Sequence, residues 1–184
     1  MKKMISITVI GPDRPGIIAA LTGAVYRAGG NLEDASMTIL EGEFAMILIA
    51  CLKNAATERR LLRDLARLER FKKLTVMVKE IKRRLVRGEK HGRGTEPYVI
   101  SVYGKDRAGI VYQVSKLLAD QGLNITDLNS RIIGSGVKSL YTLILEVDLP
   151  TRPRFLAPLN KRFDLLAKKM GVAVTLKRLE SVQF

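Results

Sequence analysis

The sequence is poor in the residues that build disulfides and metal sites. Among its 184 residues there is one cysteine, Cys51, one histidine, His91, and no tryptophan. A single cysteine cannot form an internal disulfide, and a single histidine cannot supply the several imidazoles of a His-based metal site. These absences exclude a disulfide scaffold and a zinc module, and we expect no metal site and no cofactor.

Long hydrophobic runs are also missing. No apolar run approaches the roughly 20 residues that cross a bilayer, and the Met1-Lys2-Lys3 start leads into a short alternating segment rather than a signal-peptide core. Apolar residues make up 47% of the chain and charged residues 27%, which is ordinary for globular proteins. We therefore expect a folded cytoplasmic protein with no membrane partner.

Acidic residues are in deficit, chiefly in one region. The chain has 32 Lys and Arg against 18 Asp and Glu, a formal net charge of +14, and residues 53–93 alone hold 15 basic and 5 acidic residues. Clustered cations can attract nucleic acid or an acidic partner. The alternative is a solvated helix face that continues into a charged linker.

The chain contains an internal repeat. A shift of 93 positions aligns residues 7–17 with residues 100–110, and the alignment continues through three further identities. These are Gly29 with Gly122, Asn31 with Asn124, and Asp34 with Asp127. The repeat predicts two copies of one module, residues 1–80 and 97–184, joined by a basic, glycine-containing linker, residues 81–96.

Hydrophobic spacing predicts the same order of elements in each copy. In the first copy it predicts a strand from about Ile5, a helix over 16–28, a hairpin of strands 32–40 and 44–52, a helix behind Thr57 as N-cap, and a strand over 74–78. In the second copy it predicts strand 98–103, helix 109–121, strands 125–134 and 137–147, helix 153–169 and strand 172–178. Split βαβ units of this kind form a four-stranded antiparallel sheet with two helices on one face. We expect an α+β fold of two ferredoxin-like βαββαβ modules.

Both copies share a turn between the first strand and the first helix, residues 11–16 and 104–109. A helix start exposes about four unpaired N–H groups and a partial positive charge, so it can hold a carboxylate. Asn31 and Asn124, which we expect near the same end of the sheet, could bind a carboxylate or an ammonium group. Together these groups suit a zwitterion.

A purely structural interpretation of the same residues is also open. Asp13 and Asp106 could cap the helices, the glycines could allow tight packing, and each asparagine could adopt a left-handed conformation after a helix end.

The Asp-Arg-Pro-Gly-Ile turn at 13–17, the Gly-Gly-Asn-Leu sequence at 29–32, Asp34 and the apolar strand at 44–48 resemble the ACT domain. This family consists of small βαββαβ regulatory modules that typically respond to amino acids. A chain of two such modules resembles the glycine cleavage system transcriptional repressor family. The second copy departs from the turn motif, because Ala108 stands where the first copy has Pro15, and Lys105 where it has Pro12.

The resemblance implies a ligand site in each copy. The sites would comprise Asp13, Arg14, Pro15, Gly16 and Ile17 with Asn31, and Asp106, Arg107, Gly109 and Ile110 with Asn124. It implies an amino-acid-sensing regulator that acts through a protein partner. Because unpaired sheet edges favour pairing between modules, we also expect a homodimer.

Two other functional classes fit less well. Cys51 lies in an apolar strand pattern and is expected in the core, while His91 lies in the linker, so no nucleophile–base pair is indicated and we expect no enzyme. Direct nucleic-acid binding through residues 53–93 is the alternative function. Aliphatic strands offer no stacking platform, and pairs such as Arg60 with Asp64 should neutralise part of the charge, so we expect only weak or nonspecific contact.

Overall fold

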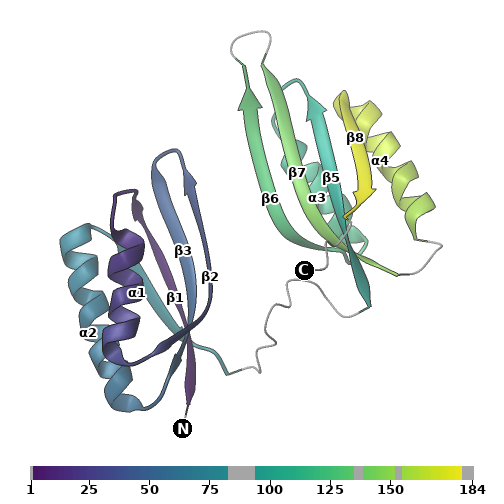
Figure 1. Cartoon of the computed structure of the whole chain (residues 1–184). Coiled ribbons are helices and arrows are strands. Elements are labelled where there is room, and N and C mark those ends of the chain that lie inside the picture. Colours follow the sequence, from purple (N-terminus) through teal and green to yellow (C-terminus); the bar gives the residue numbers. More distant parts are fainter. Residues whose placement is uncertain (1, 83–93, 135–138, 152–154, 180–184) are drawn as a thin grey trace. The chain divides into compact units, whose positions relative to one another are not determined.

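The computed structural model describes residues 2–82, 94–134, 139–151 and 155–179. The chain divides into two compact units, residues 1–85 and 86–184, called here the first and second unit (Figure 1). Most of the predicted linker, residues 83–93, lies outside the described residues, so its boundaries remain a prediction.

The two units contain the same six elements in the same order. The first unit consists of β1 (Lys3–Pro12), α1 (Ile17–Ala28), β2 (Asn31–Leu40), β3 (Glu43–Leu52), α2 (Ala55–Lys72) and β4 (Thr75–Glu80). The second consists of β5 (Thr95–Gly104), α3 (Ile110–Asp120), β6 (Asn124–Ile133), β7 (Leu140–Pro150), α4 (Leu156–Met170) and β8 (Val172–Arg178). The predicted βαββαβ order is confirmed in both.

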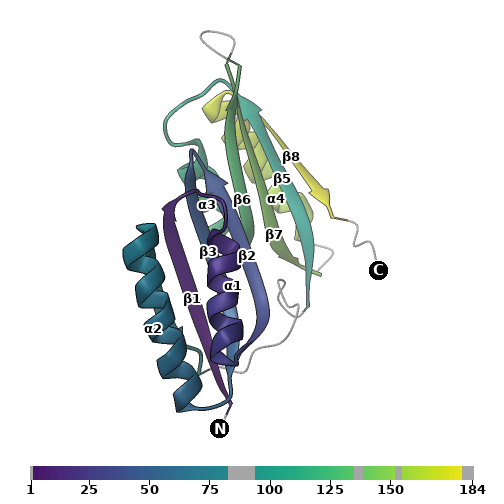
Figure 2. The same ribbon diagram turned by 60° about the vertical axis from the view of Figure 1, so that its left-hand side comes forward.

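Each unit is a two-layer structure of one sheet and two helices. The sheet orders are β2-β3-β1-β4 and β6-β7-β5-β8, and neighbouring strands are antiparallel. Figure 2 shows α1 and α2 on one face of the first sheet. The α+β, ferredoxin-like fold class predicted from the sequence is therefore confirmed.

Strand alternation fills the space between sheet and helices. In β1, Ile5, Ile7 and Val9 are buried, while Ser6 and Thr8 between them point to the other face. Leu48 of β3 and Leu145 of β7 hold equivalent central positions, since each pairs with a buried isoleucine of the adjacent strand and is fully buried. Each unit thus has its own hydrophobic core.

The start of α2 differs from the prediction. Its N-cap is Asn54, not Thr57: the Asn54 side-chain Oδ1 accepts a hydrogen bond from the backbone N–H of Thr57 at 3.0 Å. Thr57 lies inside the first turn and is buried. The helix therefore begins three residues earlier than the leucine stripe suggested.

Within the described residues, no helix is both long enough and apolar enough to span a membrane.

Candidate functional site

The β1–α1 turn, residues 13–16, is hydrogen-bonded to the turn of the β2–β3 hairpin. The backbone N–H of Asp13 donates to the carbonyl of Gly42 at 2.8 Å. Gly16 then adopts φ 86° as the N-cap residue of α1, and a Cβ added there would meet no atom within 4 Å. Glycine is therefore favoured here by the left-handed backbone and not by crowding, and Gly109 repeats this in the second unit with φ 92°.

The starts of α1 and α3 have no side-chain cap. The N-cap residues are the two glycines, and neither helix start receives a hydrogen bond from a side chain of the described residues. The first helical bond of α1 runs from Ala20 N–H to the Gly16 carbonyl at 3.0 Å, so the N–H groups of the preceding turn have no partner in the helix. The interpretation in which Asp13 and Asp106 cap these helices is wrong, and the helix dipole remains open to an anion.

A cavity of about 560 Å³ opens at the turn of the first unit. It is lined by Asp13, Arg14, Pro15, Gly16, Ile17, Ile18 and Ala19 of the turn and helix, and by Met37, Ile39 and Phe44. Of the apolar lining residues Phe44 is 1% exposed, while Met37 and Ile39 are 40% and 51% exposed. The cavity therefore joins the open helix start to an apolar wall.

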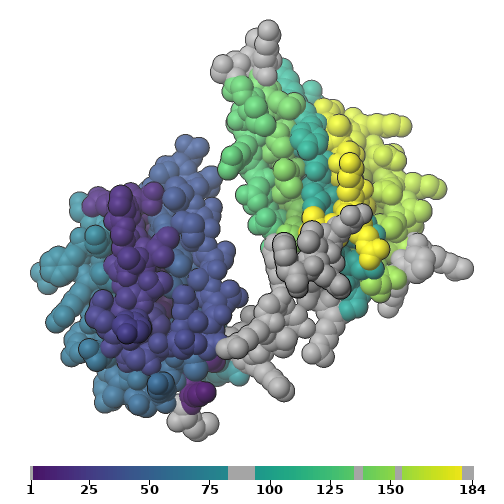
Figure 3. All heavy atoms as spheres, viewed as in Figure 1, coloured from purple at the N-terminus to yellow at the C-terminus, as the bar shows by residue number. Residues whose placement is uncertain are grey.

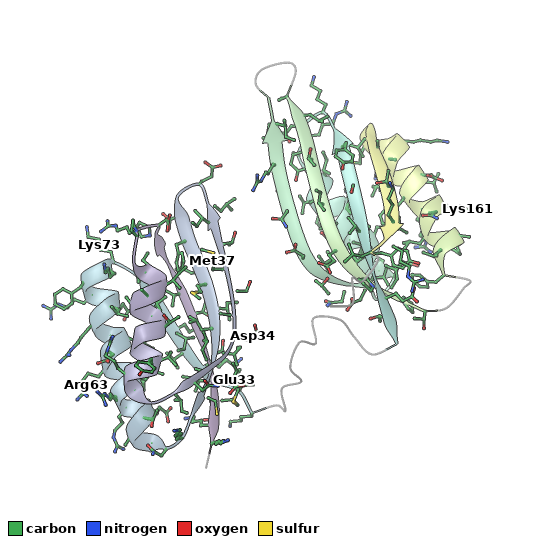
Figure 4. The ribbon with its side chains drawn as sticks, in the orientation of Figure 1. Glu33, Asp34, Met37, Arg63, Lys73 and Lys161 are labelled. Carbon is green, nitrogen blue, oxygen red and sulfur yellow. The ribbon has the colours of Figure 1, made fainter. Side chains whose placement is uncertain are left out.

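Sequence reasoning missed that apolar wall. Met37 pairs with Met46, and Ile39 with Phe44, so both belong to the helix-covered side of β2. β2 is an edge strand of the sheet, and the side chains of Met37 and Ile39 stay partly exposed; Figure 4 labels Met37. The alternation of inward and outward side chains along β2, combined with the register of the β2–β3 hairpin, is the signal that could have located Met37 and Ile39.

This turn carries two charged side chains, Asp13 and Arg14. Within the part of the chain that the structure describes, Asp13 and Arg14 form no side-chain hydrogen bond or ion pair, and both are exposed. Arg14 and the helix N–H groups can bind a carboxylate, and Asp13 can bind an ammonium group. The apolar wall can accept an aliphatic or thioether side chain.

The equivalent arginine of the second unit is engaged. Arg107 Nη1 donates to the carbonyl of Met170, in the last turn of α4, at 3.4 Å. The next residue is Gly171, where an added Cβ would lie 3.4 Å from that same Nη1. In the first unit the equivalent position after α2 is held by Lys73, a non-glycine residue with a left-handed backbone, φ 53°.

The structure does not bring Asn31 and Asn124 to the turns. Asn31 pairs with Cys51, whereas Pro12, which precedes the turn, pairs with Glu43 at the other end of β3. Because the β1–α1–β2 crossover returns along the 12 residues of α1, β2 begins about 18 Å from the turn. The expectation that each asparagine lies near the turn of its own module is therefore wrong, and Asn124, which pairs with Asp148, repeats the arrangement.

A second cavity, of about 460 Å³, surrounds Asn31. It is lined by Lys2, Tyr26, Gly29, Gly30, Asn31, Glu33, Cys51 and Lys53. Asn31 Nδ2 donates to Glu33 Oε1 at 2.9 Å. An irregularity in the register between Leu32 and Asp34 places Asn31 and Asp34 on the same face of the sheet, and Figure 4 labels Glu33 and Asp34 there. Neither asparagine adopts the left-handed conformation considered above.

Of Cys51 and His91, the two residues considered for catalysis, the structure describes only Cys51. Cys51 is partly exposed and pairs with Met4 and Asn31 on the face away from the helices, so the expectation that it belongs to the core is wrong. His91 lies outside the described residues. In the described ranges, no group of three or more His, Cys, Asp or Glu side chains is placed to hold a metal ion.

Family models match both units. A model of the ACT domain matches residues 3–79, and a second ACT domain model matches residues 98–164. Among curated relatives, a UPF0237 protein of Methanocaldococcus jannaschii is 36% identical over 76 residues, which are 41% of this chain and 80% of that protein. A UPF0237 protein of Methanococcus maripaludis is 33% identical over 82 residues, 45% of this chain and 87% of the relative.

Two solved structures share the fold over nearly the whole chain. An unknown protein from Galdieria sulphuraria has a TM-score of 0.78 at 21% identity, covering 98% of this chain and 100% of the other. A "putative glycine cleavage system transcriptional repressor" has a TM-score of 0.70 at 20% identity, covering 98% and 99%. At these identities the likeness establishes the fold alone.

Proposed function

The chain belongs to the ACT-domain family, with one ACT domain in each unit, and we propose on this basis that it is a regulatory protein that senses an amino acid. The sensing site is the β1–α1 turn of the first unit, with Asp13, Arg14, Pro15, Gly16 and Ile17 as its ligand-binding residues.

One observation carries the proposal: the uncapped start of α1 opens into a cavity that contains two unpaired side chains of opposite charge. Arg14 and the helix N–H groups bind the α-carboxylate, Asp13 binds the α-ammonium group, and the side chain of the ligand lies against Met37 and Ile39. An exposed charge pair by itself contributes little, so part of the affinity comes from the helix N–H groups and the apolar wall.

The second turn is a weaker site in this proposal. Asp106, Gly109 and Ile110 repeat the residue types of the first turn, but Arg107 already donates to the α4 carbonyl. A carboxylate ligand would have to displace that hydrogen bond, so we propose that the second turn binds the same ligand more weakly or remains empty.

The output of the protein is a contact with another protein. The fold shared with the repressor-like structure supports a role in transcriptional regulation of the glycine-cleavage type, exerted through a protein partner. The edge strand β2 carries exposed Leu40, and the edge strand β6 carries exposed Ile132 and Ile133, so pairing of edges would cover apolar surface. We propose a homodimer, which light scattering at micromolar concentration tests directly: a mass of one chain would contradict it.

A thermal-shift screen of the twenty amino acids tests the site. A ligand present at one hundred times its dissociation constant stabilises the protein by about 2.7 kcal/mol. We expect one or a few amino acids to stabilise the wild type, and Arg14→Gln or Asp13→Asn to remove that response without lowering the melting temperature of the free protein. Arg107→Gln and Asp106→Asn are the matched controls and should respond as wild type does.

Two results would contradict the proposal. The first is that no amino acid stabilises the protein, and the second is that the Arg14 and Asp13 variants respond like wild type. Asn31→Ala adds a separate measurement: because Asn31 lies at the opposite end of the sheet from the turn, the response should survive, and its loss would show that the site includes this amide.

A further inference from the structure

The outer face of α2 carries five arginines in one stripe. They are Arg59, Arg60, Arg63, Arg67 and Arg70, and all five are exposed. At 3.6 residues per turn they fall within about 100° of the helix circumference, opposite the buried Leu61 and Leu65. Figure 3 shows side chains of α2 projecting from the surface of the first unit, and Figure 4 labels Arg63 on its outer side.

The acidic residues of α2 do not neutralise this stripe, because each one contacts a different element. Lys3 Nζ of β1 lies 2.7 Å from Glu58 Oε1, and this hydrogen bond, with a second one to Glu80, raises the pKa of Lys3. Asp64 lies 3.7 Å from Arg27 Nε of α1.

The third acidic side chain also contacts another element: Glu69 Oε1 accepts a hydrogen bond from the backbone N–H of Val76 in β4 at 3.1 Å. The expected pair of Arg60 with Asp64 is not formed, because Asp64 contacts Arg27 of α1 instead. The three carboxylates hold α2 to β1, α1 and β4, and the arginines remain available to solvent.

The composition of the stripe fits phosphate better than a protein surface. Arginine binds phosphate oxygens in a two-pronged geometry that lysine cannot make. The five residues span about 16 Å of helix, one positive charge per 3 to 4 Å, comparable to the 3.4 Å between phosphates along one strand of a duplex. The centre of a protein interface is instead depleted in charge and built around apolar anchors.

We propose that the outer face of α2 is a binding surface for the phosphate backbone of nucleic acid, which it contacts without reading the sequence. The contact would give a dissociation constant of about 10⁻⁴ to 10⁻⁶ M near physiological salt, as backbone contacts alone do. It does not depend on the amino-acid site, which lies at the β1–α1 turn on other residues.

The second unit supplies a matched control. Over their helical ranges α2 has six basic and three acidic residues, and α4 has four basic and one acidic, so both carry a formal charge of +3. Three of the four basic residues of α4 are lysines, which do not bind phosphate in the two-pronged geometry of arginine. Figure 4 labels Lys161 on α4.

The test measures how salt affects binding of the full chain to a labelled 20-base-pair DNA duplex. Wild type is compared with Arg63→Gln/Arg67→Gln/Arg70→Gln and with Lys161→Gln/Arg162→Gln/Lys168→Gln, which remove the same charge. Each lost phosphate contact lowers the slope of log K against log salt by about 0.9. We expect the α2 variant to lower the slope by 2 to 3, so that wild type loses up to about 40-fold more affinity than the variant between 50 and 200 mM salt.

The α4 variant should change the slope by less than about 0.9, the change expected for the loss of one phosphate contact. Equal effects of the two triple variants, or no effect of the α2 variant, would overturn the proposal. Tighter binding of poly-L-glutamate than of duplex DNA, lost in the α2 variant, would also overturn it by assigning the face to an acidic protein. Should the triple variant fold poorly by circular dichroism, Arg63→Gln and Arg67→Gln alone should each lower the slope by about 0.9, and unchanged slopes in both would refute the proposal.

Discussion

The two copies of the β1–α1 turn share aspartate, arginine and glycine, yet their arginines have different surroundings. Arg14 has no partner among the described residues, whereas Arg107 donates to the last turn of α4. The residues that follow the second helices also differ, Lys73 after α2 and Gly171 after α4. A repeated motif therefore does not ensure a repeated site, because the partner of Arg107 is supplied by a residue 63 positions along the chain.

The largest effect should come from the feature that the units have in common. Leu48→Ala and Leu145→Ala each remove a fully buried side chain from an equivalent position. We expect each to lower the free energy of unfolding of its own unit by about 2 to 5 kcal/mol. Chemical denaturation followed by site-resolved hydrogen exchange measures this, and a variant that weakens both units equally would show that their cores are not separate.

A smaller effect on stability should distinguish α2 from α4, because only α2 has a side-chain N-cap. Asn54→Ala removes the side-chain cap of α2 and should cost about 1 kcal/mol in urea denaturation. α4 starts at Phe155, which has a helical backbone and no side-chain cap. Phe155→Asn should therefore bring no comparable gain, since its φ of −84° and ψ of −34° do not suit a capping residue. A neutral Asn54→Ala would refute the assigned cap.

The smallest effect on stability tests the origin of the asymmetry. Lys73→Gly relieves a left-handed non-glycine residue and should stabilise the first unit by up to about 1 kcal/mol. We also expect it to let Arg14 approach the end of α2 as Arg107 approaches the end of α4, so amino-acid affinity should fall while the fold becomes more stable. If affinity is unchanged, Lys73 is not what keeps Arg14 available.

The sequence predicted what depends on local pattern. Alternation at Ile5, Ile7 and Val9 located β1, and the βαββαβ order determined the sheet topology, because split βαβ units pack in few ways. The residues of the turn itself were also identifiable from the repeat.

Prediction failed where the outcome depends on which elements meet in space. Asn31 was expected beside the turn, but a crossover through a helix brings the chain back to the opposite end of the sheet. Asp64 was expected to pair within its own helix, yet Arg27 of α1 lies closer once the helices pack. Neighbour spacing along one element cannot reveal a partner that another element supplies.

Ligand stoichiometry tests the central claim, that the first β1–α1 turn is the amino-acid site, most directly. Isothermal titration with the amino acid that gives the largest thermal shift should show one molecule bound per chain with high affinity. That binding should be lost in Arg14→Gln and kept in Arg107→Gln. Two equivalent sites per chain, or binding that survives Arg14→Gln, would contradict the claim.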